Sequence, residues 1–149
     1  MTGSPAVQAA STDTGIHAEV QQFYAHQMQL LDRRACEEWA ATFTPDGVFA
    51  ANGLPAPVRG REAIAAAARA AGERLAADGL VHRHWLGMLT VTAAPGGELF
   101  ARSYALVIQI RLGGTSEIHR STVCEDRLVR AEDGSLLVLD RRVTRDDLA

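Results

Sequence analysis

The chain has 149 residues, of which 47% are hydrophobic and 22% charged, and its formal net charge is −3. This length fits one domain, and the composition is that of a folded protein, which excludes a disordered or collagen-like chain. The weakly negative charge provides no electrostatic footprint for a phosphate backbone, so we expect no nucleic-acid partner.

Residue usage limits the chemistry further. All 15 basic residues are arginines, so neither a lysine Schiff base nor a lysine general base can form. Cys36 and Cys124 lack the paired spacing of a zinc or redox site, and we expect two reduced thiols in a cytoplasmic protein. The sequence predicts neither a signal peptide nor a membrane span, and we expect a mobile tail over residues 1–15 before one domain over residues 16–149.

The first half of the chain predicts three helices and one brief strand. Apolar residues recur at three- and four-residue steps in the first helix, and the third is dense in alanine. A Thr-Pro-Asp-Gly sequence at 44–47 predicts a turn before the strand. In chain order we expect a helix over Ile16–Leu31 capped by Asp13 or Thr14, a short helix from Asp32, a strand over Val48–Ala51 and a helix over Arg61–Ala77.

The second half predicts an antiparallel meander. Its four long segments are rich in Val, Leu, Ile and Thr and are separated by glycine-containing turns of hairpin length. Helices that precede such a sheet indicate an α+β domain, and we expect a curved antiparallel sheet wrapped as a cone around the three helices. The expected strands are Val81–Ala93, Glu98–Leu112, Thr115–Arg130 and Ser135–Arg145.

Three local patterns accompany this order of elements. They are Phe43-Thr-Pro-Asp-Gly-Val-Phe49, Gly60-Arg-Glu-Ala-Ile64, and the pair Asp126-Arg-Leu-Val-Arg130 with Asp140-Arg-Arg-Val143. Together they resemble the SnoaL-like group of the nuclear transport factor two-like superfamily, over residues 16–147. The resemblance implies the cone fold. It leaves the activity open, because the superfamily contains polyketide cyclases, isomerases, dehydratases, epoxide hydrolases and non-catalytic modules.

His84 is the main catalytic candidate. The stretch His84-Trp-Leu-Gly87 is similar to the His-aromatic-aliphatic-Gly stretch of scytalone dehydratase, in which the histidine is an acid/base in the pocket. Imidazole titrates near neutral pH, which suits proton transfer. The structural alternative is a core histidine bonded to a backbone carbonyl. His82 shares its face, but no third ligand stands at a recognisable spacing, so we expect neither a metal site nor a cofactor.

Tyr24 and Asp126 are the other catalytic candidates. Tyr24 corresponds to the first-helix tyrosine that donates to an oxyanion in ketosteroid isomerase, whereas the general-base position of that family falls on Ala51. Asp126 is either an acid/base whose pKa rises inside an apolar cone or the ion-pair partner of an arginine on a neighbouring strand. The candidate arginines are Arg102, Arg141 and Arg142.

Several further side chains are candidates for substrate contact. The alternative for the apolar ones is ordinary core packing. The candidates are Arg102, Tyr104, Asn52, Trp39, Phe43, Phe49 and Met88.

The resemblance implies an acid/base enzyme that acts on a hydrophobic or aromatic polyketide-type intermediate by cyclisation, isomerisation, dehydration or epoxide opening. The alternative is a non-catalytic binding or assembly module similar to the β subunit of ring-hydroxylating dioxygenases. In either case we expect a homodimer formed through the outer face of the sheet.

Overall fold

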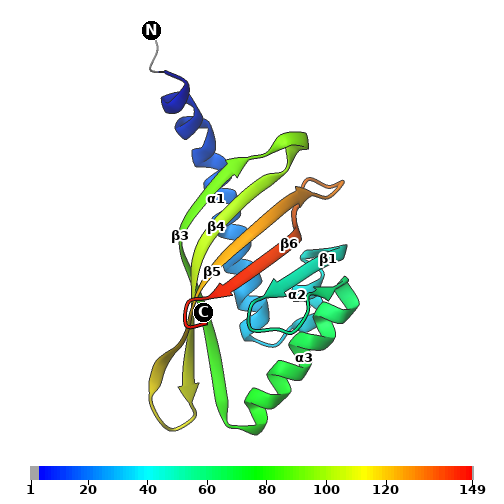
Figure 1. Ribbon diagram of the computed structural model, residues 1–149, viewed down its shortest axis with the longest axis vertical. Coiled ribbons are helices and arrows are strands. Elements are labelled where there is room, and N and C mark those ends of the chain that lie inside the picture. Colours follow the sequence, from blue (N-terminus) through cyan, green and yellow to red (C-terminus); the bar gives the residue numbers. More distant parts are fainter. Residues whose placement is uncertain (1–3, 149) are drawn as a thin grey trace.

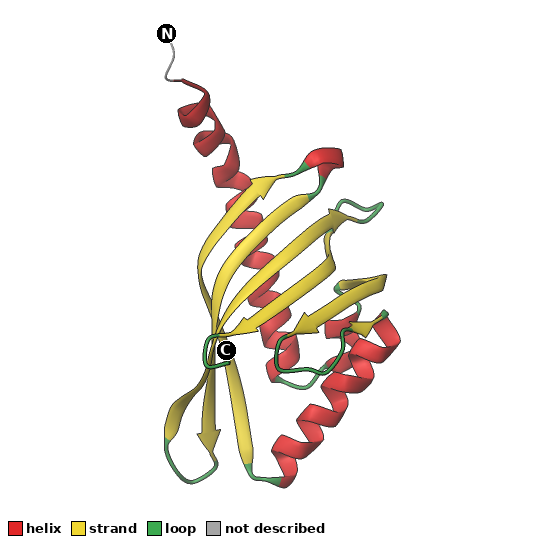
Figure 2. Ribbon diagram, in the orientation of Figure 1, coloured by secondary structure: helices red, strands yellow, loops and turns green. Residues whose placement is uncertain are grey.

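The computed structural model describes residues 4–148, with side chains from residue 14 onward. The first part of the expected tail, residues 1–3, lies outside this range. Figures 1 and 2 show the arrangement of the helices and strands. The elements are α1 (Ser4–Asp32), α2 (Cys36–Ala40), β1 (Phe43–Ala51), β2 (Val58–Arg59), α3 (Arg61–Ala77), β3 (Leu80–Ala93), a 3₁₀ turn (Pro95–Gly97), β4 (Leu99–Arg111), β5 (Ser116–Arg130) and β6 (Leu136–Arg145).

The two ends of α1 differ from the expected ones. The helix begins at Ser4 and therefore runs through both expected caps, in keeping with the alanine-rich sequence and the proline in its first turn. It ends at Asp32, which we expected to start the second helix. Arg34 has a left-handed backbone with φ of 64°, and the N–H groups of Arg34 and Ala35 donate to the carbonyls of Leu31 and Leu30. This bonding is that of a Schellman cap, which usually has glycine at the left-handed position.

The sheet confirms the predicted meander and adds a parallel strand pair. The strand order is β2-β1-β6-β5-β4-β3, and the hairpins β3–β4, β4–β5 and β5–β6 are antiparallel. β1 runs parallel to β6, so the curved sheet is mixed rather than wholly antiparallel. The expected turn at 44–47 lies inside β1, where the register with β6 shifts between Phe43 and Val48. The predicted helix over Arg61–Ala77 is confirmed as α3.

The helices cover the inner side of an open sheet. α1 packs along β3 and passes behind the strands in Figure 1, while α3 contacts β1 and β2 at one edge of the sheet and β3 at the other. The edge strands β2 and β3 do not pair with each other, so the sheet does not close into a barrel. α3 contacts both edges and spans the gap between them. The C-terminal end of α1, α3 and β3 therefore surround a common space at this gap.

Alternation along β4 decides which side chains face the helices. Ala101 and Ser103 are almost completely buried, whereas Phe100, Arg102 and Tyr104 are exposed on the outer face. The buried core consists mainly of α1, the inner face of the sheet and α2, with Val20, Leu30, Phe43, Leu128 and Val138 among its members. Among the described residues, no helix has the length and apolarity needed to span a bilayer.

Candidate active site

His84 and Asp32 form a bonded pair at the inner side of β3. The last residue of α1, Asp32, accepts a hydrogen bond from His84 Nδ1 at 2.6 Å and a second from the His84 backbone N–H at 3.1 Å. The side chain of His84 is 23% exposed and that of Asp32 is 9% exposed. A carboxylate only accepts hydrogen bonds, so the proton of a neutral His84 lies on Nδ1 and its Nε2 carries a lone pair.

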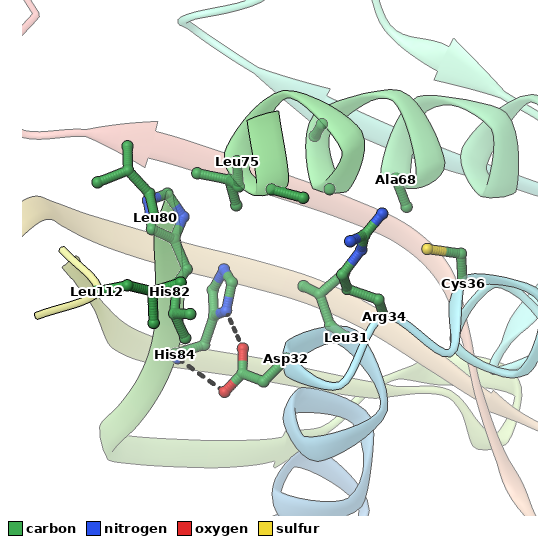
Figure 3. A pocket seen from close by; sticks show the side chains of 14 residues that line it. Leu31, Asp32, Arg34, Cys36, Ala68, Leu75, Leu80, His82, His84 and Leu112 are labelled. Atoms are coloured by element: carbon green, nitrogen blue, oxygen red, sulfur yellow. Dashed lines mark hydrogen bonds and ion pairs between the residues drawn. The ribbon is translucent and has the colours of Figure 1, made fainter. Parts of the chain in front are cut away.

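Three adjoining apolar cavities lie at or beside this pair, and His84 lines two of them. A cavity of about 380 Å³ lies between the end of α1, α3 and β3, and Figure 3 shows the His84 ring standing in it between Asp32 and α3. An inner cavity of about 150 Å³ is also lined by His84, and a third of about 430 Å³ lies under α3. Leu31 lines all three, while Trp39 and Phe49 line the second and third. The imidazole therefore stands where a hydrophobic molecule entering between α1 and α3 would meet it.

Arg34 supplies a positive charge to the lining of the cavity of about 380 Å³. Its side chain points toward α3, and it lies against Gly72, where a Cβ atom would come within 2.9 Å of the Arg34 Nε. Glycine in the middle of a helix costs stability, and here its absent side chain leaves room for the guanidinium. The guanidinium is therefore positioned by two features: the left-handed backbone of Arg34 and the absence of a side chain at Gly72.

A second polar group lies deeper, between α1 and the sheet. Arg141 donates from Nε to Asp126 Oδ1 at 2.9 Å and from Nη2 to Asp126 Oδ2 at 2.8 Å. The Tyr24 hydroxyl donates to Asp126 Oδ2 at 2.5 Å, and Gln27 Oε1 accepts from Arg141 Nη2 at 2.7 Å. Asp126 is 0% exposed and Arg141 is 3% exposed, so this is a buried ion pair in which both carboxylate oxygens accept hydrogen bonds.

Burial determines the protonation of the groups around this pair. Burial and then the negative charge of Asp126 raise the pKa of Tyr24 far above its usual value, so the phenol keeps its proton. Burial likewise raises the pKa of the Cys124 thiol to about 12. Burial opposes the charge on Arg141, but the carboxylate of Asp126 outweighs it and raises the pKa of the guanidinium.

The structure brings some of the predicted site residues together. His84, Trp39 and Phe49 line the inner cavity, and Arg141, one of the arginines considered as a partner for Asp126, lines it too. Tyr24 donates to Asp126, and it also lines a further cavity of about 430 Å³ that His84 and Asp32 line as well. Asp126 lines none of these cavities.

Other predicted residues lie elsewhere. Arg102 and Tyr104 lie on the outer face of the sheet. In β4 it is the alternate residues, such as Ala101 and Ser103, whose side chains face the helices. Met88 is 74% exposed at a bulge in β3, where it lines the cavity of about 430 Å³ that His84 and Asp32 also line. Asn52 is exposed and ties the end of β1 to the backbone of Arg145. Phe43 is completely buried in the core beside Trp39.

Sequence reasoning missed Asp32, which was interpreted as the start of a helix. An acidic residue in the last turn of a helix faces the negative end of the helix dipole, and this unfavourable placement is a signal of another role. It becomes visible only once α1 is known to end at Asp32.

His82, the other member of His-x-His, donates from Nε2 to Gln109 Oε1 at 2.9 Å. Among the side chains of residues 14–148, no group of three or more His, Cys, Asp or Glu residues is arranged to hold a metal ion.

Comparison with known proteins places the chain among its relatives. Residues 14–142 match the SnoaL-like domain. ActVI-ORFA from Streptomyces coelicolor is 36% identical with a TM-score of 0.85, and the match covers 91% of this chain and 98% of that chain. A protein from Catenulispora acidiphila, solved in complex with S-DNPA, is 39% identical with a TM-score of 0.80 over 89% of this chain and 95% of that chain.

A more distant structure shares the fold alone. A chain from Novosphingobium aromaticivorans, described as the β subunit of an aromatic-ring-hydroxylating dioxygenase, is 22% identical with a TM-score of 0.74. That match covers 93% of this chain and 94% of that chain. No curated protein matches the chain in sequence.

Proposed function

Because this chain belongs to the SnoaL-like family, we propose that it is an acid/base enzyme acting on a hydrophobic or aromatic polyketide-type intermediate. The reaction is a proton transfer that leads to cyclisation, isomerisation, dehydration or epoxide opening, and His84 is its principal acid/base. The observation that carries the proposal is the bond of 2.6 Å between His84 Nδ1 and Asp32 Oδ1 at the junction of the apolar cavities.

The pair supports a complete proton cycle. With Nδ1–H held by Asp32, the Nε2 lone pair of His84 takes a proton from a carbon or oxygen of the substrate. The imidazolium that forms is stabilised by the carboxylate, and it returns the proton to another substrate atom. Asp32 thus orients the ring and stabilises its charged form, so we assign it as a positioning residue.

The lining favours a hydrophobic substrate. The cavities of about 380 and 150 Å³ that His84 lines are bounded mainly by aliphatic and aromatic side chains, which bury apolar surface and exclude water around the reacting atoms. The S-DNPA complex of the Catenulispora acidiphila relative supports small-molecule binding in this family. Tyr24 and Asp126 hold Arg141 in this proposal, because the proton of Tyr24 is already donated to Asp126.

Hydrogen–deuterium exchange tests the chemistry without knowledge of the natural substrate. Aromatic ketones are incubated with the protein in D₂O, and exchange of the protons next to the carbonyl is followed by NMR. We expect the protein to accelerate exchange of at least one ketone. His84→Gln should slow it by about 100-fold or more, and Asp32→Asn should slow it while preserving the fold.

The matched control is His26→Gln, because His26 is an exposed histidine of α1 that lines none of these cavities. It should keep the full exchange rate. Wild-type exchange in a folded His84→Gln variant would remove the assigned role of His84. Absence of exchange for every ketone, with binding retained, would favour the non-catalytic module.

The outer face of the sheet supports the expected homodimer. Trp85 and Tyr104 are 68% and 50% exposed on adjacent strands, and large exposed apolar groups are common at interfaces. We propose that a second copy covers this face. Sedimentation of the wild type as a dimer and of Trp85→Glu as a monomer would agree, and a monomeric wild type would contradict it.

A further inference from the structure

The indole of Trp39 has a buried donor without an acceptor. Trp39 is 5% exposed, and its Nε1 is the buried side-chain nitrogen or oxygen that lacks a hydrogen-bond partner within the described residues. Its ring is held edge-on against Phe43 and Phe49, at centroid distances of 5.2 and 6.3 Å. Buried indole N–H groups usually find an acceptor, so an unpaired one beside a cavity calls for an explanation.

Arg141 brings a second donor to the same cavity. Both residues line the inner cavity of about 150 Å³, together with His84. The Nε and Nη2 atoms of Arg141 are engaged by Asp126 and Gln27, whereas its Nη1 makes no hydrogen bond within residues 14–148. Bidentate bonding to Asp126 holds the guanidinium, and its carbon lies over the Tyr24 and Phe43 rings at 5.6 and 5.5 Å from the ring centroids. The cavity is therefore apolar, with two N–H donors on residues that line it.

The charge of this arrangement selects the kind of acceptor. Asp126 neutralises Arg141, so a carboxylate bound in the cavity would leave one uncompensated negative charge in an apolar enclosure. A neutral carbonyl oxygen accepts both hydrogen bonds without that cost. A cavity of about 150 Å³ also holds one benzene-sized ring.

We infer that the inner cavity is a subsite for the neutral carbonyl oxygen of a ring-bearing ketone, which accepts hydrogen bonds from Trp39 Nε1–H and Arg141 Nη1–H. This inference rests on the proposed function and deepens it. When His84 Nε2 takes a proton from the carbon next to the carbonyl, the C–H electron pair forms a C=C bond and the carbonyl electrons move onto oxygen. The two donors stabilise that enolate oxygen, and reprotonation by His84 completes the cycle.

Binding of three matched probes tests the subsite without turnover. Acetophenone has the carbonyl, α-methylstyrene has the same shape with CH₂ in place of oxygen, and benzoate has a full negative charge. Affinities are measured by ¹H–¹⁵N NMR titration, in which the indole signal of Trp39 is distinguished from that of Trp85 with a Trp85→Phe variant. We expect acetophenone to bind about tenfold more tightly than either other probe and to shift the Trp39 N–H signal downfield.

Trp39→Phe keeps an aromatic ring and removes the donor. It should weaken acetophenone binding about fivefold to tenfold while leaving α-methylstyrene binding unchanged, whereas Trp85→Phe should change neither. Equal affinity for acetophenone and α-methylstyrene, tighter binding of benzoate, or no binding of any probe would each overturn the inference. The deuterium-exchange assay tests the acid/base role of His84 independently of these binding measurements. Exchange without selective binding of acetophenone would refute the subsite and leave the proposed function intact. Selective binding without exchange of any ketone would refute the proposed function and leave the subsite intact.

Discussion

Replacing Asp126 with asparagine removes the charge from a carboxylate that is completely buried beside Arg141. Each carboxylate oxygen accepts from two donors. Oδ1 accepts from Arg141 Nε and from the Cys124 thiol, and Oδ2 accepts from Arg141 Nη2 and from the Tyr24 hydroxyl. Whichever way the amide of asparagine turns, its NH₂ group faces two donors, and the arginine charge is left without a counter-ion.

The magnitude follows from this burial. Breaking a buried ion pair by removing one partner typically costs about 3–5 kcal/mol, because the remaining charge stays out of water. At about 3 °C per kcal/mol for a chain of this length, the melting temperature should fall by roughly 9–15 °C. The exposed pair of Arg127 and Glu98 has the same chemistry and a bidentate geometry, with side chains 54% and 27% exposed. Glu98→Gln should therefore cost less than about 1 kcal/mol.

Urea unfolding followed by far-ultraviolet circular dichroism measures both variants against the wild type. The slope of the unfolding free energy against urea should stay constant, since the surface exposed on unfolding is nearly unchanged. A loss in Asp126→Asn that is no larger than the loss in Glu98→Gln would refute the reasoning. It would mean that the buried pair contributes no more than a solvated one.

Two further predictions concern Gly72 and Cys124. Gly72→Ala should raise the melting temperature by roughly 1.5–3 °C, from a gain of about 0.5–1 kcal/mol in helix propensity, because its Cβ displaces only the flexible side chain of Arg34. A lower melting temperature would show that Arg34 cannot move. The raised pKa of Cys124, about 12, predicts no alkylation by iodoacetamide at pH 8 until the protein is unfolded by urea. Because that pKa lies above the ordinary value of 9.0, the stabilisation is complete below pH 9 and is lost as the pH rises toward 12. The free energy of unfolding should fall by up to about 1.4 kcal/mol per pH unit in that range, and Cys124→Ala should flatten the fall, whereas equal slopes would contradict it.

Part of the candidate site was predictable from local sequence. His84 was selected by its place in a strand and by the motif around it, and the structure puts it beside a cavity. Trp39 and Phe49 were selected as apolar candidates and line that cavity. For Asp126, the interpretation as an ion-pair partner agrees with its two bonds to Arg141.

Other parts depended on information that no short segment contains. The side chains of a strand alternate with a period of two, but the period does not say which set faces inward, so Arg102 and Tyr104 were assigned to the pocket although they lie outside it. The end of α1 was misplaced because its cap has Arg34 where the left-handed position usually has glycine.

By itself, the sequence determined the α+β class, the meander, the helix over Arg61–Ala77 and the family. These features follow from hydrophobic periodicity, turn residues and motifs within a few residues of one another. Only the tertiary structure decided that Asp32 meets His84 across 52 residues of chain, and that β1 joins the sheet parallel to β6. Such contacts depend on where a helix ends and how the sheet curves, and both are set by the packing of the whole domain.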